Sequence, residues 1–224
     1  MKIGNNGFYV IDDTSSQIIE ISNGVYASLF IADTSKSFEF VLGKNSRLDF
    51  FGFFTRGSSD LLKFRQDGEN SYLKIKQMFF CSSSDLKSSI KSIINSNNSK
   101  SFVDIISIVK DKKVSIDSSI EIEKGCIGVD ADLKQKNIFI GDKGEVRGLP
   151  KLFVKSFSVK ASHSCNVERI NDDYLFYLKS RGIDENTAIT LMIKSFFVKN
   201  FSCLKMLDKK LYDKTYDDFL TLNI

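Results

Sequence analysis

His163 and Cys165 are the residues of this sequence whose types and spacing could do chemistry. His163 is the only histidine in 224 residues, and Cys165 follows it by two positions in the alternating run VKASHSC. Residues i and i+2 of a β-strand point to the same face, so an imidazole and a thiol could converge there. Such a pair predicts half of a transient metal site, or one donor set shared across a dimer. The alternative, a hydrogen-bonded histidine beside a small apolar cysteine filler, stays open.

The other motifs that carry chemistry are not found. The four cysteines, Cys81, Cys126, Cys165 and Cys203, lie far apart without a CxxC pair, which indicates neither a zinc site nor a disulfide framework. We interpret Cys81, Cys126 and Cys203 as structural and expect a reducing, cytoplasmic environment. No phosphate-binding loop, GxSxG or HExxH is present, and no run is apolar enough to predict a signal or a membrane partner.

Composition predicts a globular protein with a substantial core. The hydrophobic fraction is 42% and the charged fraction 27%. The net charge of +4 comes from 32 basic and 28 acidic residues, and the lysines are scattered rather than gathered in blocks. This pattern is typical of a solvated surface, so we expect no nucleic-acid partner.

Short runs of period-2 alternation from Gly7 to about Ser162 predict the elements that position this pair. FEFVL at residues 38–42 is one example, and turn residues follow many runs. The spacing fits an antiparallel sandwich or a solenoid, and the consecutive aromatics FFGFF at residues 50–54 favour the solenoid. The Ser/Asn-rich residues 82–101 predict an exposed loop or a short helix.

At Asn171 the period changes to that of helices. Asn171 is a favourable N-cap, and Arg181 followed by Gly182 is a typical helix end. Asp184 predicts the N-cap of a second helix, and a weaker third segment covers residues 204–219. The apolar stripe of the second helix comprises Ile189, Met192, Ile193, Phe196 and Phe197.

Aromatic residues surround the first predicted helix. Tyr174, Phe176 and Tyr177 cannot all face one core, so some of them pack on another element or form a binding surface. Burial against the second helix and contact with a partner are both compatible with the pattern.

These segments together resemble the SufB/SufD family of the SUF iron–sulfur cluster assembly system. The similarity rests on GLPKL at residues 148–152, VKASH at 159–163, LFYL at 175–178 and SRGI at 180–183. NIFIGD at residues 137–142, Ala188 and Phe196-Phe197 continue it, so the firm resemblance covers about residues 133–200.

The resemblance implies a mainly β fold, a right-handed parallel β-helix with a C-terminal α-helical hairpin. Residues 1–170 would form the β-helix core and residues 171–224 the ATPase-docking segment. The protein would be a non-catalytic scaffold that pairs with a SufB/SufD-type partner or a second copy. ATP would be hydrolysed by a bound SufC-type ABC ATPase. The residues implied to bind it are Tyr174, Phe176, Tyr177, Arg181 and Gly182.

The resemblance also implies a role for His163. In SufD-type members the matching histidine lies at the subunit interface, so His163 is expected to take part in cluster assembly as a transient metal ligand. Cys165 is a further candidate that the family does not supply. Gln135 and Ser164 stand where SufB-type members carry a cysteine and a glutamate, which makes the chain more SufD-like. We therefore expect no stably bound cofactor, only an iron–sulfur cluster in transit.

Two other hypotheses come from different classes of protein. A β-solenoid carbohydrate lyase or hydrolase would need acidic residues gathered on one face of successive coils. Asp117, Asp130, Asp132 and Asp142 could supply them, although they lie near turns. A purely structural β-protein with appended helices is the third hypothesis.

Overall fold

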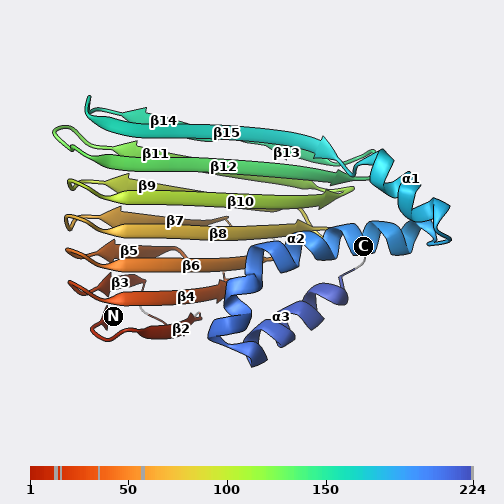
Figure 1. Ribbon diagram of the computed structural model, residues 1–224, viewed down its shortest axis with the longest axis horizontal. Helices are drawn as coiled ribbons and strands as arrows, with labels where there is room; N and C mark the ends of the chain where they lie inside the picture. The colour runs from red at the N-terminus through yellow and green to blue at the C-terminus, as the bar shows by residue number, and fades with distance from the viewer. Residues whose placement is uncertain (13–14, 16, 35, 57–58, 223–224) are drawn as a thin grey trace.

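The computed structural model describes residues 1–12, 15, 17–34, 36–56 and 59–222. The described chain winds as a parallel β-solenoid, and its strands alternate between two sheets that we name sheet A and sheet B (Figure 1). Sheet A contains β1 (Lys2–Ile3), β3 (Ile18–Ile21), β5 (Phe38–Leu42), β7 (Ser59–Gln66), β9 (Leu86–Ile94), β11 (Lys113–Ile122), β13 (Glu145–Arg147) and β14 (Lys151–Val154). Sheet B contains β2 (Gly7–Ile11), β4 (Tyr26–Ala32), β6 (Arg47–Phe54), β8 (Tyr72–Cys81), β10 (Lys100–Lys110), β12 (Val129–Ile140) and β15 (Val159–Arg169).

The period-2 alternation fills the space between the sheets with apolar side chains, which we call the inner core. Phe40 and Phe64, on neighbouring strands of sheet A, stack with ring centroids 4.8 Å apart. Phe50 of sheet B meets both rings edge-on at 5.3 and 5.0 Å. Offset and edge-on aromatic pairs are the favourable geometries, so the rings hold the two sheets together.

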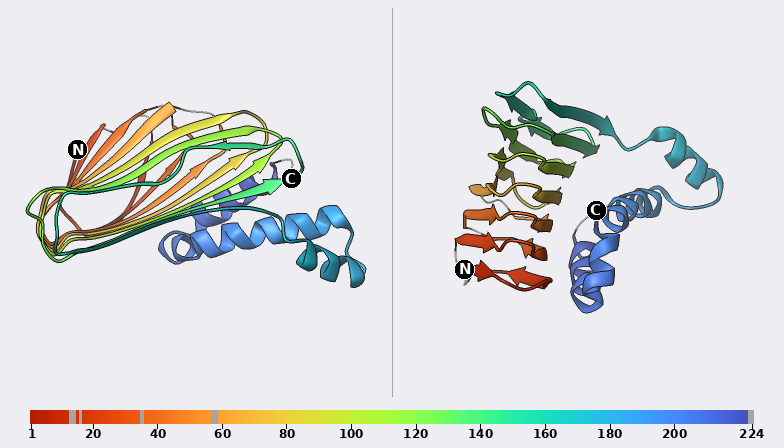
Figure 2. Two further views of the ribbon diagram at one scale, coloured as in Figure 1. Left: turned by 90° about the horizontal axis from the view of Figure 1, so that it is seen from above. Right: turned by 60° about the vertical axis from the view of Figure 1, so that its left-hand side comes forward.

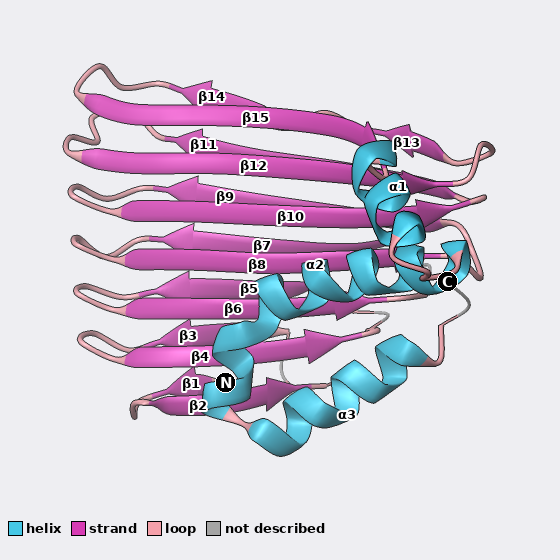
Figure 3. Ribbon diagram, turned by 45° about the vertical axis from the view of Figure 1, so that its right-hand side comes forward, coloured by secondary structure: helices cyan, strands magenta, loops and turns pink. Residues whose placement is uncertain are grey.

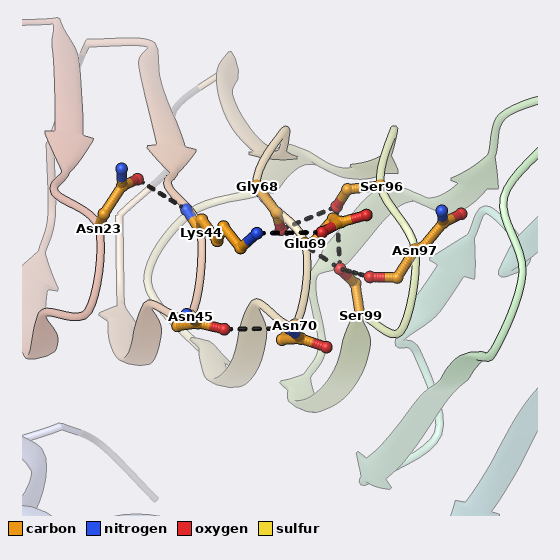
Figure 4. A network of polar contacts seen from close by, with 9 residues as sticks. All are labelled: Asn23, Lys44, Asn45, Gly68, Glu69, Asn70, Ser96, Asn97 and Ser99. Carbon is orange, nitrogen blue, oxygen red and sulfur yellow. Dashed lines mark hydrogen bonds and ion pairs between the residues drawn. The ribbon is translucent and has the colours of Figure 1, made fainter.

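The turns that lead from sheet A to sheet B repeat from coil to coil. Each of the five turns before β4, β6, β8, β10 and β12 has a residue in the left-handed region at an equivalent position, and glycine and asparagine are tolerated best there. These residues are Gly24, Asn45, Asn70, Asn98 and Gly128, with φ between 55° and 71°. Figure 4 shows how the turns connect: the Asn70 amide donates to Asn45 Oδ1 at 3.0 Å. Asn23 Oδ1 likewise accepts from the backbone N–H of Lys44 at 2.8 Å.

A second apolar cluster, which we call the outer core, lies on the opposite face of sheet B. The consecutive aromatics of β6 serve both cores, because Phe50 and Phe54 point inward while Phe51 and Phe53 point outward. Three helices follow the strands, namely α1 (Asp172–Ser180), α2 (Glu185–Leu207) and α3 (Lys209–Leu220). Helices α2 and α3 lie across sheet B and bury their apolar faces in the outer core (Figures 2 and 3).

The prediction of a mainly β parallel solenoid with C-terminal helices is confirmed, and the antiparallel sandwich is excluded. Strand β15 ends at Arg169, so the predicted helical segment, residues 171–224, starts after the last strand. Its residues 223–224 lie outside the described part of the chain. The prediction of a loop or short helix over residues 82–101 was wrong. Leu86–Ile94 is strand β9, whose buried and partly exposed residues alternate strictly.

Candidate functional site

The last coil of the solenoid is open. Strand β15 pairs with β12, and β14 pairs with β11, while the opposite edges of β14 and β15 have no strand partner among the described residues (Figure 1). The side chains of β15 are almost all exposed or half-buried. Unpaired backbone N–H and C=O groups along an edge strand are a template on which another chain can pair.

Several large apolar side chains are exposed along this open coil. Phe157, in the turn between β14 and β15, is fully exposed. The other large apolar residues that stay exposed there are Leu149, Phe153, Val154 and Val167. Large apolar side chains that stay exposed on an unpaired coil favour an interaction site. Sequence reasoning missed these residues, although a phenylalanine between Ser156 and Ser158 in a turn was a usable signal.

His163 lies on β15 beside Leu133 of β12, on the strand face that continues the inner core. Its Nδ1 is 2.9 Å from the backbone oxygen of Pro150. A carbonyl oxygen can only accept, so we assign the proton of the neutral imidazole to Nδ1. The lone pair of Nε2 then stays available to a proton or a metal ion.

The Pro150 carbonyl reaches His163 because the strand of sheet A is interrupted there. Gly148 has φ +94°, and a Cβ at this position would be 1.9 Å from the backbone oxygen of Ile116. Only glycine fits this close approach. Pro150 has no N–H to pair with β11, so the strand stops at Arg147 and resumes at Lys151. The sequence signature of residues 148–152 therefore positions a hydrogen-bond acceptor for the histidine.

Cys165 lies on the same face of β15 as His163, as the two-residue spacing predicts. Its register partner is Gln135 of β12, and its Sγ accepts from Asn137 Nδ2 at 3.6 Å. Gln135 and Asn137 are buried and belong to a polar chain in which Ser118 donates to Gln135 Oε1 at 3.1 Å. Burial raises the pKa of the Cys165 thiol, and the Asn137 hydrogen bond opposes the rise only in part. The isolated chain therefore holds Cys165 as a thiol rather than a thiolate at neutral pH.

The cysteines are expected to differ strongly in reactivity. Burial raises the pKa of the Cys81 thiol to about 11, and burial also raises the pKa of Cys126. Because the thiolate is the reactive form, iodoacetamide at pH 8 should modify the exposed Cys203 first and Cys165 more slowly. Cys81 and Cys126 should react only after denaturation. Mass spectrometry of timed samples measures this order, and early modification of Cys81 would contradict the buried placement.

The described residues contain no group of three or more His, Cys, Asp or Glu side chains placed to hold a metal ion. The acidic residues considered for a carbohydrate enzyme are not gathered on one face of successive coils, although Asp130 and Asp132 share one face of β12. Asp117 lies on sheet A and is paired with Lys151 at 2.7 Å, whereas Asp132 lies on sheet B and is paired with Lys134 at 2.6 Å. Asp142 follows β12 and is paired with Arg169.

Helix α1 projects from the solenoid and buries none of its residues (Figure 2). Its predicted ends are confirmed: the Asn171 side chain accepts from the Tyr174 N–H at 3.0 Å, and Gly182 has φ +83°. Tyr174, Phe176 and Tyr177 are 66%, 75% and 54% exposed. Burial against α2, one of the two interpretations left open by the sequence, therefore does not account for them.

An apolar groove of about 440 Å³ separates α1 from α2. Tyr174 and Tyr177 form one wall, and Leu191 and Met192 of α2 contribute to the other. An ion pair between Lys179 and Glu185 at 2.6 Å joins the two helices beside the groove. Arg181 extends its guanidinium over the Tyr177 ring at 5.4 Å. The five residues predicted to bind an ATPase thus lie on α1 and at its C-terminal end. The residues of α2 that form the other wall of the groove were not part of that prediction.

Helices of the described chain are too short or too polar to cross a membrane. The fold, the open last coil and the exposed helix α1 define a class of protein. It is a parallel β-solenoid whose last coil is unpaired and is followed by an exposed helix. The model of the family "SUF system FeS cluster assembly, SufBD core domain" matches residues 34–196. This chain belongs to that family, and the resemblance is confirmed.

Individual relatives match a shorter segment. The iron–sulfur cluster assembly protein SufD of Escherichia coli is 34% identical over 90 residues, which are 40% of this chain and 21% of that protein. SufD of Bacillus subtilis is 31% identical over 90 residues, with the same two shares of 40% and 21%. A chloroplastic SufBD family protein of Arabidopsis thaliana is 38% identical over 60 residues, 27% of this chain and 11% of the relative. The matched part of the chain therefore spans about a fifth of the length of these relatives, or less.

Proposed function

We propose that this chain is a non-catalytic, cytoplasmic scaffold subunit of a SUF-type iron–sulfur cluster assembly complex. The observation that carries the proposal is the open last coil, which combines unpaired strand edges, exposed apolar residues and a histidine with a free Nε2. Membership of the SufBD core family supports the same role. ATP hydrolysis would belong to a partner subunit.

The last coil is the proposed pairing surface. The free edges of β14 and β15 would join the corresponding edges of a SufB/SufD-type partner or of a second copy, and Phe157 would be buried in the contact. Pairing satisfies the edge N–H and C=O groups and removes apolar surface from water. The same contact would cover His163 and Cys165.

The iron–sulfur cluster is the proposed cargo of this interface. His163 would donate the Nε2 lone pair, because Nδ1 already donates its proton to Pro150. Cys165 would ligate iron as a thiolate, so binding would release the proton that burial favours in the isolated chain. Two donors are fewer than a cluster needs, and the partner would supply the remainder.

Helix α1 is the proposed docking surface for a SufC-type ABC ATPase. Its exposed aromatics and the groove beside Leu191 offer apolar anchors, and Arg181 adds a cation at the rim. Aromatic residues and arginine are the side chains that most often dominate binding energy at protein interfaces.

Two substitutions on the last coil test the proposal. Phe157→Asp is expected to weaken pairing about tenfold or more, because a carboxylate would be buried without a partner. His163→Ala is expected to leave pairing intact but lower cluster formation about tenfold or more through the lost ligand. Size-exclusion chromatography with light scattering measures pairing. The visible absorbance of anaerobically reconstituted complex measures the cluster.

Matched controls come from the same strands and turns. Ile127 precedes Val129 of β12 by two residues, as Phe157 precedes Val159 of β15, and Val129 and Val159 are register partners on adjacent coils. Ile127→Asp should therefore leave pairing unchanged. Ser164→Ala, on the opposite face of β15 from His163, should leave the cluster unchanged. Full cluster formation by the His163→Ala complex would remove this residue from the proposal, and unchanged pairing of Phe157→Asp would remove the interface.

A further inference from the structure

A basic pocket lies between the outer face of sheet B and helix α2. Its volume is about 250 Å³. Four lysines line it from three elements, namely Lys76 of β8, Lys134 and Lys136 of β12, and Lys199 of α2. One carboxylate, Asp104 of β10, stands among them. The charged groups of the lining therefore sum to an excess of positive charge.

Only part of this positive charge is compensated within the protein. Lys134 is paired with Asp132 at 2.6 Å, and Lys136 is paired with Glu168 at 2.6 Å. Lys76 and Lys199 form no ion pair within the described part of the chain. Two ammonium groups on facing walls thus remain available to an anion, and a small concave site strengthens their combined field.

The pocket also contains a buried donor without a partner. Asn200 of α2 is 4% exposed, and its Nδ2 has no hydrogen-bond acceptor among the described residues. A buried amide N–H without an acceptor destabilises the fold, and native structures satisfy almost all such groups. Asn200 lines the pocket, so a ligand oxygen that enters beside it can accept this hydrogen bond.

The remaining wall is apolar. The half-buried ring of Phe196 faces the pocket, with Lys136 Nζ 4.9 Å from the ring centroid, and Ile106 lies on the sheet side. Planar apolar groups pack well against such a ring. A site with lysines, one amide donor and one aromatic wall suits a ligand with an anionic end and a planar body.

We propose that this pocket binds a small phosphate monoester that carries a planar ring. The phosphate would lie between Lys76 and Lys199 and accept from Asn200 Nδ2, while the ring would pack on Phe196. Lysine serves as a point-charge phosphate binder, and the cavity is near the lower end of small-molecule sites, which start at about 300 Å³. The proposed phosphate contacts, Lys76, Lys199 and Asn200, belong neither to the last coil nor to α1, so the site does not depend on the proposed scaffold role.

Isothermal titration calorimetry of the full chain tests the site with three probes: adenosine monophosphate, inorganic phosphate and adenosine. The monophosphate should bind tightest, inorganic phosphate more weakly, and adenosine not measurably. Lys76→Gln and Lys199→Gln should each weaken monophosphate binding about fivefold, which is the effect of one charge pair in a solvated site. Asp104→Asn should strengthen binding, because it removes the opposing charge.

Lys100→Gln is the matched control, since Lys100 is an exposed lysine on β10 outside the pocket. It should leave the affinity unchanged, and higher salt should weaken binding to the original sequence. The proposal is overturned if adenosine binds as tightly as the monophosphate, if no probe binds at millimolar concentration, or if Lys100→Gln is as harmful as Lys199→Gln. Thermal melting of each variant confirms that it folds, as expected for surface lysines.

Discussion

Replacement of Phe197 by alanine is expected to lower the free energy of unfolding by about 3–5 kcal/mol, the range for a fully buried phenylalanine. Phe197 is 0% exposed in the outer core. Its ring centroid lies 4.8 Å from that of Phe219, 4.9 Å from Phe201 and 5.7 Å from Phe53. The change would therefore leave a cavity where α2, α3 and β6 meet.

Urea denaturation followed by circular dichroism measures this effect, and the neighbouring Val198→Ala is the control. Val198 is 44% exposed, so its substitution should change the free energy of unfolding by about 0.5 kcal/mol at most. Similar losses for the two variants would mean that α2 does not pack on sheet B as described.

If a SufC-type ATPase docks on α1 as proposed, replacement of Tyr174 and Phe176 by glutamate should reduce its binding about a hundredfold or more. The reason is that two exposed aromatic anchors would become carboxylates that an apolar interface must bury. The fold should not change, because α1 buries no residue and glutamate is favourable in the first half of a helix. Copurification and surface-binding measurements with the ATPase quantify the loss.

Met206→Glu is the control for this experiment. Met206 is 89% exposed near the opposite end of α2, so a charge there should leave ATPase binding intact. Undiminished binding of the Tyr174→Glu, Phe176→Glu variant would assign the ATPase to another surface. Equal losses for both variants would indicate a nonspecific effect of added negative charge.

The helices were predictable from local chemistry. Asn171 and Asp184 accept hydrogen bonds from the N–H groups three residues later, as their positions before apolar runs predict. The end of α2 was not predictable to the same degree. The helix continues to Leu207, past the stripe that ends at Phe197, because Phe201 and Leu204 extend the buried face into the outer core.

Strand β9 shows why composition misled the prediction for residues 82–101. Its inward positions include Ser88 and Ser92, which suggested a loop. Ser92 and Ser101 lie within hydrogen-bond distance at 2.9 Å, so their hydroxyl groups are satisfied inside the solenoid. Such pairing joins strands of different sheets, and a single sequence does not reveal it.

The candidate site, like the fold, was predictable from the sequence only in part. A period of two places His163 and Cys165 on one face from sequence alone, and the structure has them so. The acceptor for His163 is the Pro150 carbonyl, and the neighbour of Cys165 is Asn137. The contact of Cys165 depends on the register between successive coils, and the contact of His163 depends on how the two sheets of the last coil face each other. A single sequence reveals neither arrangement. The exposure of Phe157 also depends on topology, because no described strand pairs with the outer edges of β14 and β15.

The outer core has a consequence for how the protein unfolds. A solenoid held only by contacts between adjacent coils tends to lose its coils one at a time from an end. Here α2 and α3 contact side chains from β4, at Phe30, through β12, at Ile140, and so connect coils that do not touch one another. Fraying of a middle coil would require the helices to detach from all the others. The helices should therefore turn a stack of separable repeats into a single cooperative unit, except at the last coil, where β15 is free to open.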